Sequence, residues 1–307
     1  MTRNQRFIVW GVALAAAAGV SPLYAQAPEP GGQPPMVELT GSWATSNDEE
    51  RLIRTDPGPE LGNFTGFPLN AAGQQKALTW NSTIQAVPEH QSRPHSGTYS
   101  MRGPGPNFHM GEIIDPATRR LIAYTITGLF ENANRTIWLD GRPHPSEYAE
   151  HLWPGFSTGE WENGMLHVTT THVKQMFLQR NGIPVSPYAV MHEFFIRHGD
   201  RLLLISQVDD PVYLDEPMVR TSTFRWNPGQ REGGLAPVEI AEELPGLRQG
   251  DVPHYPLGSR HPEYADENKL PFEATLGGKE TLYPEYAEKL KHLMPTTQTA
   301  PGGGGAK

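Results

Sequence analysis

The sequence predicts a mainly β fold, an antiparallel meander that closes into a barrel or packs as a sandwich. Two observations predict it. Between residues 108 and 226, apolar and polar residues alternate with the period of two that is typical of strands. Hairpin-type turns interrupt this alternation at short intervals, and six or more strands at such spacing are typical of antiparallel barrels and sandwiches.

The first 25 residues have the layout of a secretory signal peptide. Arg3 and Arg6 form a short basic region, an apolar run extends from Phe7 to Val20, and small residues follow around Ala25. The run is too short for a comfortable membrane span. We therefore expect cleavage near Ala25 and a periplasmic or secreted protein, the alternative being an uncleaved membrane anchor. Residues 26–36 then form a proline- and glycine-rich linker.

The composition excludes two classes of partner. The chain has 34 acidic and 25 basic residues, and loss of Arg3 and Arg6 with the signal peptide leaves 23 bases against 34 acids, a formal charge of −11. Nucleic acid binding needs clustered lysine and arginine, so no nucleic acid partner is expected. No later stretch is apolar enough to span a membrane. The chain has no cysteine, so no disulfide contributes to its stability.

The elements follow in chain order. LTGSWATS at residues 39–46 begins the ordered part, and residues 66–80 predict a short helix with Asn70 as its N-cap. Residues 88–107 are dense in proline and glycine and predict an irregular connection. The strand region follows, from residue 108 onward.

The stretch GFSTGEWENGMLHVTTTHV gives the strongest hairpin pattern. Asn163-Gly164 favours a two-residue type I′ turn. This turn places Trp161 opposite Leu166 and Ser157 opposite Thr170. The period of two then puts His172 on the same apolar face, remote from the turn.

A second hairpin, MHEFFIRHGDRLLLISQVDD, turns at Gly199-Asp200 and places Phe194 opposite Ile205. His192 continues that face away from the turn. If the sheet closes, we expect His172 and His192 at one cavity mouth, where an imidazole can act as general acid, general base or metal ligand. The alternative for each is a histidine at the edge of the core that hydrogen-bonds a backbone carbonyl.

His144 lies between Pro143 and Pro145 in the stretch TIWLDGRPHPSEY. The two prolines fix the loop and hold His144 in an extended conformation beside Arg142. An arginine and a histidine positioned in this way could bind a carboxylate or an enolate oxygen. The alternative is a structural corner, in which Pro145 simply opens a short helix.

No familiar catalytic, nucleotide or zinc motif is present, and no cofactor is expected. On a strand, His192 and His198 share a face but lie about 20 Å apart, too far to chelate one ion. A metal site would need the fold to bring His144, His172 and His192 together, so no metal site is predicted. The adjacent Asp209 and Asp210 point to opposite faces of an extended strand and do not form a glycosidase pair.

Aromatic residues are grouped in the strand region, and most of them are expected to belong to the core. Some could line a pocket for a small apolar or aromatic molecule. The residues assigned to such a pocket are Trp138, Trp153, Trp161, Phe194, Asn181, Asp210 and Tyr213.

These assignments divide the chain into parts. Residues 37–228 form a single β domain, residues 229–294 a proline-rich extension that packs on it, and residues 295–307 a disordered tail. A proline followed by Glu-Tyr-Ala, or by Ser-Glu-Tyr-Ala in the first copy, recurs at residues 145, 262 and 284. Each copy predicts the start of a short helix.

Four motifs carry a resemblance to a known family. They are RTIWLDGRPHP, GFSTGEWE, EFFIRHGD and DPVYLDEP, which begin at residues 135, 155, 193 and 210. The chain resembles a large group of secreted Gram-negative bacterial proteins that mostly have no assigned activity. The resemblance covers about residues 90–228 and implies an exported β protein without implying a reaction. Gly41-Ser42-Trp43 is also similar to the start of lipocalin-like barrels, which implies a barrel. The local patterns add short peripheral helices and an irregular C-terminal extension to this expected fold.

Three functions remain open. The first is a periplasmic barrel that holds a small apolar or aromatic molecule, with a mouth lined by His172, His192 and the Arg142/His144 loop. The second is a lyase, isomerase or hydratase on the same barrel, in which one histidine abstracts a proton and Arg142 stabilises the anion. The third is an envelope-associated module whose proline-rich tail binds a partner. The sequence indicates no oligomeric state.

Overall fold

A computed structural model describes residues 37–48, 60–87, 97–98, 107–128, 134–179, 181–230, 248 and 251–293. The predicted signal peptide, the linker at residues 26–36 and the tail at residues 295–307 lie outside the described residues. Most of the predicted irregular connection at residues 88–107 lies outside them as well.

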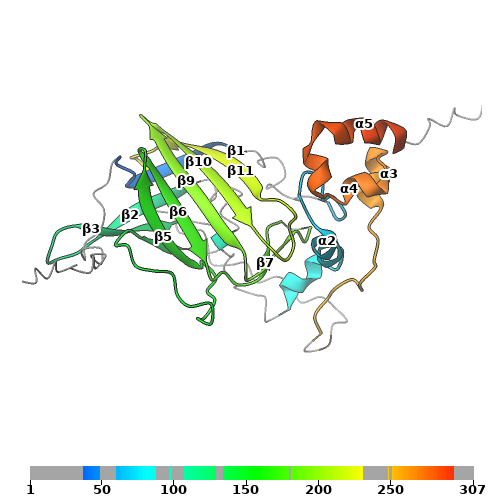
Figure 1. Ribbon diagram of the computed structural model, residues 1–307, viewed down its shortest axis with the longest axis horizontal. Coiled ribbons are helices and arrows are strands. Elements are labelled where there is room, and N and C mark those ends of the chain that lie inside the picture. Colours follow the sequence, from blue (N-terminus) through cyan, green and yellow to red (C-terminus); the bar gives the residue numbers. More distant parts are fainter. Residues whose placement is uncertain are drawn as a thin grey trace, which may run out of the picture.

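The described residues form a closed β barrel with the strand order β1-β11-β10-β9-β6-β5-β4-β3-β2 (Figure 1). The barrel strands are β1 (Gly41–Asp48), β2 (Asn107–Ile114), β3 (Leu121–Thr127), β4 (Arg135–Trp138), β5 (Phe156–Glu162), β6 (Met165–Thr171), β9 (Val190–His198), β10 (Arg201–Asp209) and β11 (Met218–Trp226). The remaining elements are α2 (Ala71–Leu78), the 3-10 turn η1 (Ser82–Ala86), β7 (Met176–Phe177), β8 (Pro184–Val185), α3 (Glu263–Asn268), α4 (Phe272–Thr275), the 3-10 turn η4 (Lys279–Leu282) and α5 (Pro284–Leu293). The predicted mainly β fold class is confirmed, and the sheet forms a barrel and no sandwich.

One strand pair departs from the predicted antiparallel meander. β4 and β5 are parallel, with Ile137 beside Ser157. Parallel neighbours need a connection that returns the chain to the starting end of the sheet. Residues 139–155 form this crossover, which contains the proline-flanked His144. The small β7–β8 sheet lies in the connection from β6 to β9.

The predicted registers of both hairpins are confirmed. Asn163 and Gly164 both have positive φ, 50° and 83°, as a type I′ turn requires. Trp161 pairs with Leu166 across this turn, and Phe194 pairs with Ile205 in the second hairpin.

In the first strand, packing around two tryptophan rings explains why residue 41 is a glycine. Trp43 is fully buried, its indole Nε1 donates a hydrogen bond to the carbonyl of Leu39 at 2.9 Å, and its ring meets Trp226 edge-on at 5.2 Å. Gly41 has a φ of 114°, and a Cβ built there would lie 2.1 Å from the Trp226 ring. Only glycine therefore fits at position 41 without displacing that ring.

The buried apolar residues form two clusters. The barrel cluster lies inside the strands around Trp43, Phe108, Phe195 and Phe224. The cap cluster lies at the other end of the barrel. It combines the strand residues Met191, Val208 and Met218 with residues from 64–78 and 173–189.

The helices α2, α3, α4 and α5 all lie to one side of the barrel, on the side where β7 is found (Figure 1). Asn70 is the N-cap of α2, as predicted, and its side chain accepts a hydrogen bond from the amide of Gly73. The amide of Phe64 donates to the carbonyl of Thr275 at 2.8 Å, which ties the C-terminal helices to the segment before α2. No helix among the described residues is long and apolar enough to cross a membrane.

The three Pro-Glu-Tyr-Ala-like copies do not share one conformation. The copies at 262 and 284 begin α3 and α5, which confirms two of the three predicted helix starts. The copy at 145 forms only a turn, in which the amide of Ala149 donates to the carbonyl of Ser146. The third prediction is wrong, because this copy lies in the crossover, where Ser146 and His172 are hydrogen-bonded.

Candidate functional site

Six neighbouring strands of the barrel each place a buried polar residue on the inward face. We call this set the polar belt. Its members are Arg135 on β4, Ser157 on β5, Thr170 on β6, Glu193 on β9, Ser206 on β10 and Ser222 on β11. Barrel interiors are normally filled by apolar side chains, so buried polar residues on six neighbouring strands are an exception in need of a physical reason.

An ion pair forms the centre of the belt. Nη2 of Arg135 lies 2.5 Å from Oε2 of Glu193, and the two side chains are 3% and 0% exposed. Nη1 of Arg135 donates to the hydroxyl of Thr170 at 3.4 Å, and Thr170 lies 2.8 Å from the hydroxyl of Ser157. Removing two charges from water costs several kcal/mol per ion, and such pairs are seldom kept for stability alone.

The belt lies between the two apolar clusters. On β9 the inward residues are Phe195, Glu193 and Met191, which belong in turn to the barrel cluster, the belt and the cap cluster. On β10 the same order is Leu204, Ser206 and Val208. The polar groups are therefore enclosed by apolar side chains on both sides, where the dielectric constant is low and electrostatic contacts are strong.

Arg135 has hydrogen-bonding capacity left over. Its Nε is buried and has no partner. A guanidinium offers five N–H donors, and an unused buried donor carries a desolvation cost. The belt can therefore accept one more hydrogen-bond acceptor, and a positively charged guanidinium favours an anionic one.

Arg142, predicted as an anion-stabilising residue, is already paired. Its Nε lies 2.8 Å from Oδ1 of Asp140, and its guanidinium carbon lies 3.5 Å from the centre of the Trp138 ring. The hydrogen bond from Arg142 holds the pKa of the Asp140 carboxyl below its ordinary value. Trp138 lies on the outer face of β4, so this group packs outside the barrel.

The predicted loop residue His144 is hydrogen-bonded at both ring nitrogens. Nε2 of His172 lies 2.9 Å from the carbonyl of Ser146, which can only accept, so His172 donates from Nε2. In the neutral ring, Nδ1 of His172 then accepts from the Thr171 hydroxyl at 2.7 Å. Thr171 in turn accepts from Nδ1 of His144 at 2.7 Å, which leaves Nε2 of His144 to accept from Thr158 at 2.8 Å.

In the neutral ring, this chain of hydrogen bonds places the hydrogen of His144 on Nδ1. Burial, followed by the nearby His172, lowers the pKa of His144 below its ordinary value. Thr158 and Thr171 belong to the outer faces of β5 and β6, so the imidazole fastens the crossover to the outside of the barrel. His144 therefore has the contacts of a structural corner, although Pro145 is followed by a turn and not by the short helix expected in that alternative. His172 has the backbone carbonyl partner that was its alternative.

The predicted position of His192 is wrong. Met191, Glu193 and Phe195 are the buried residues of β9, so His192 and Phe194 belong to the outer face. The pairing register was correct, but both faces of this hairpin carry apolar residues and the inward one was misassigned. Burial, and then His167, lower the pKa of His192, while Asp209 acts in the opposite direction. His172 and His192 therefore do not meet at one mouth.

The residues predicted to line a pocket are scattered. Trp161 packs against the barrel cluster from inside. Phe194 stacks on the ring of His167 outside, with ring centres 4.6 Å apart. Trp153 lies in the crossover, and Nζ of Lys174 lies 5.2 Å from the centre of its ring.

The remaining three predicted residues belong to the cap end. Asp210 is buried and accepts hydrogen bonds from the amide and the hydroxyl of Ser186, both at 2.7 Å. Asn181 is buried and donates to the carbonyl of Asn63. Burial, followed by Asp210, raises the pKa of Tyr213.

The sequence reasoning missed Arg135 and Glu193 as site residues, although both lie within the motifs of the family resemblance. One signal was available: Glu193 shares its face with Met191 and Phe195, so a charge lay within an apolar alternation. Arg135 likewise shares its face of β4 with the apolar Ile137.

Comparison with known proteins found no matching family model and no match among curated proteins or solved structures.

Proposed function

We propose that the barrel binds one small molecule with an apolar or aromatic body and an anionic group, and that the anionic group contacts the polar belt. The observation that carries this proposal is the buried Arg135–Glu193 pair, in which Arg135 keeps an unpartnered Nε. The barrel cluster supplies apolar and aromatic surface on one side of the belt. Residues 1–25 resemble an export signal, so we also propose that binding takes place in the periplasm or outside the cell.

The polarity of the belt favours a carboxylate or sulfonate over a neutral ligand. An arginine binds a planar anion through two parallel N–H donors. The Ser157 and Thr170 hydroxyls are hydrogen-bonded to each other, so one of the two can donate to the ligand as well. Glu193 would repel an anion placed beside it, so the ligand is expected on the Nε side of Arg135. A neutral hydrocarbon would leave Arg135 Nε without an acceptor.

No contact among the described residues favours the lyase, isomerase or hydratase alternative. Both ring nitrogens of His144 are hydrogen-bonded, and Arg142 is held by Asp140. A general base needs a nitrogen within reach of the proton it removes. Binding without chemistry is therefore the function that the geometry supports best.

The test uses 1-anilinonaphthalene-8-sulfonate, a fluorescent probe with an aromatic body and an anionic head. We expect the full chain to bind one probe molecule, and decanoate or phenylacetate to displace it while benzyl alcohol does not. Replacing both charges, R135M/E193M, is expected to weaken probe binding at least 10-fold. The control is K289M/E280M, which removes an exposed ion pair with a separation of 3.0 Å and should bind as the wild type does.

Circular dichroism of each variant shows whether the barrel is still folded. Equal probe binding by the wild type and a folded R135M/E193M variant would show that the belt takes no part in recognition. A wild-type chain that binds none of the three anions would overturn the proposal outright.

A further inference from the structure

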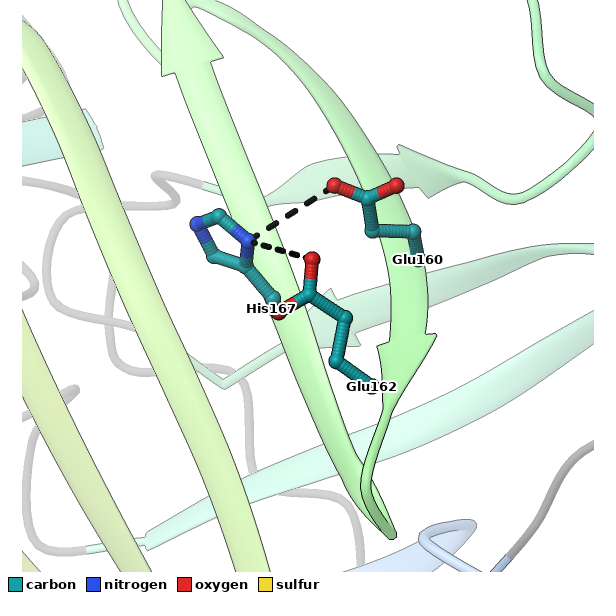
Figure 2. Close-up of side chains that lie close together, drawn as sticks. All are labelled: Glu160, Glu162 and His167. Atoms are coloured by element: carbon teal, nitrogen blue, oxygen red, sulfur yellow. Dashed lines mark ion pairs between the residues drawn. The ribbon is translucent and has the colours of Figure 1, made fainter.

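A second cluster of titratable residues lies on the outside of the barrel, at the Asn163-Gly164 turn. Glu160 and Glu162 on β5 and His167 on β6 face one another (Figure 2). Glu160 pairs directly with His167 in the sheet, and Glu162 is two residues further along the same face of β5. The register of this tight hairpin therefore fixes the three side chains as neighbours.

The distances do not fit a hydrogen-bonded group. Nδ1 of His167 lies 3.7 Å from Oε1 of Glu160 and 3.7 Å from Oε1 of Glu162. Both distances exceed the range of a hydrogen bond. Nδ1 is buried and has no hydrogen-bond partner, although His167 as a whole is 17% exposed.

The other ring nitrogen determines what Nδ1 offers. Nε2 of His167 lies 3.1 Å from Nδ1 of His192, so one of these two atoms must carry the hydrogen. When His167 is the donor, its Nδ1 presents a lone pair to two carboxylates. The two glutamate carboxylates then repel each other and the lone pair of Nδ1. A cation bound between the three groups would remove this repulsion.

We propose that Glu160, Glu162 and His167 bind one divalent transition-metal ion, Zn²⁺ foremost, with Nδ1 as the imidazole ligand. Zinc takes nitrogen at about 2.0–2.1 Å and carboxylate oxygen at about 2.0–2.2 Å, so tetrahedral ligands lie about 3.4 Å apart. The three ligand atoms already lie within 4.8 Å of one another. The two histidine–glutamate distances of 3.7 Å need to shorten by only a few tenths of an ångström, and no pair of ligand atoms needs to close by more than about 1.4 Å. The glutamates are 59% and 47% exposed, which leaves them free to make this movement.

The surroundings of His167 suit a ligand. A metal-binding histidine generally donates its second N–H to a fixed acceptor, and His192 supplies one. The ring is held from the other side by Phe194, stacked at an interplanar angle of 9°. Two carboxylates neutralise the ion, and a water molecule would occupy the fourth position on the solvent side. His167 lies on the outward face of β6 and Thr170 on the inward face, so the site is independent of the polar belt.

The experiment is a calorimetric titration of the untagged full chain with zinc chloride at pH 7.5. We expect one tightly held equivalent, and E160Q/E162Q should bind it at least 10-fold more weakly. The matched control is E147Q/E150Q, which makes the same change of charge at exposed positions in the crossover and should leave affinity within about twofold. His192→Leu is expected to weaken binding about 10-fold, as loss of a supporting acceptor typically does.

A second readout separates this site from zinc bound elsewhere. In ¹⁵N NMR of the imidazoles, zinc should change the chemical shift of the His167 Nδ1 resonance, while the hydrogen stays on Nε2. Zinc uptake that is the same in the wild type and in E160Q/E162Q, or a shift confined to other histidines, would overturn the proposal. So would the absence of any zinc binding by the wild type.

Discussion

Nη2 of Arg135 and Oε2 of Glu193 lie 2.5 Å apart across the inside of the barrel, on strands β4 and β9 that are not neighbours in the sheet. The two residues are 58 positions apart in the chain, so this ion pair is a long-range contact. We expect the stability of the barrel, and the anion recognition proposed above, to depend on this same pair.

We expect Arg135→Met to lower the free energy of unfolding by about 3–5 kcal/mol, because Glu193 then stays buried without its ion-pair partner. The double change R135M/E193M should return stability close to the wild-type value or above it, since apolar pairs often replace buried ion pairs without loss. Urea unfolding followed by circular dichroism measures both. Additive losses in the double variant would show that the two charges do not act as a pair.

The crossover depends on His144. We expect His144→Ala to destabilise the protein by about 1–3 kcal/mol, because it removes two hydrogen bonds and leaves two threonine hydroxyls without them. A double-mutant cycle with Thr171→Ala should show coupling between the two positions. His198→Ala, at the exposed last residue of β9, is the control and should change stability by less than about 0.5 kcal/mol.

The same histidine should make stability depend on pH. The pKa of His144 is lower in the folded protein than its ordinary value, so the unfolded chain takes up a proton at higher pH than the folded chain does. The contribution of His144 to the free energy of unfolding is therefore fully present above about pH 6.5, the ordinary pKa of histidine. It is lost as the pH falls below that value. Urea unfolding at pH 7.5 and 5.5 should show a smaller loss in His144→Asn than in the wild type. An identical loss in both proteins would contradict this assignment.

At the first strand we expect Gly41→Ala to destabilise the barrel by about 2–5 kcal/mol. Positive φ costs an L residue about 1–2 kcal/mol, and forcing the Trp226 ring aside adds about 1–3 kcal/mol. Gly66→Ala separates the two effects, because Gly66 also has positive φ, 74°, but nothing lies within 4 Å of a Cβ built there. Thermal unfolding should show the larger loss for Gly41→Ala. Equal losses would mean that the Trp226 contact contributes nothing.

Local patterns were sufficient for the hairpins. The turn at Asn163-Gly164 fixes which residues pair, because a two-residue loop with two positive φ angles allows one register. The N-cap at Asn70 and the helix starts at residues 262 and 284 depend on neighbouring residues only, and all three were predictable.

Long-range packing decided the candidate site. The alternation in β9 places His192 and Phe194 on one face and Glu193 and Phe195 on the other, but both faces contain phenylalanine. The inward face is the one whose carboxylate meets Arg135, and that contact exists only once the barrel is closed.

The sequence by itself determined the mainly β fold class and the turns and registers of the two tight hairpins, because these follow from residues a few positions apart. Only the tertiary structure decided that β4 and β5 run parallel, that the crossover is fastened from outside by His144, and that six polar residues form a belt inside the barrel. The physical reason is that burial and charge pairing depend on which distant strands become neighbours, and the period of a single strand does not contain that information.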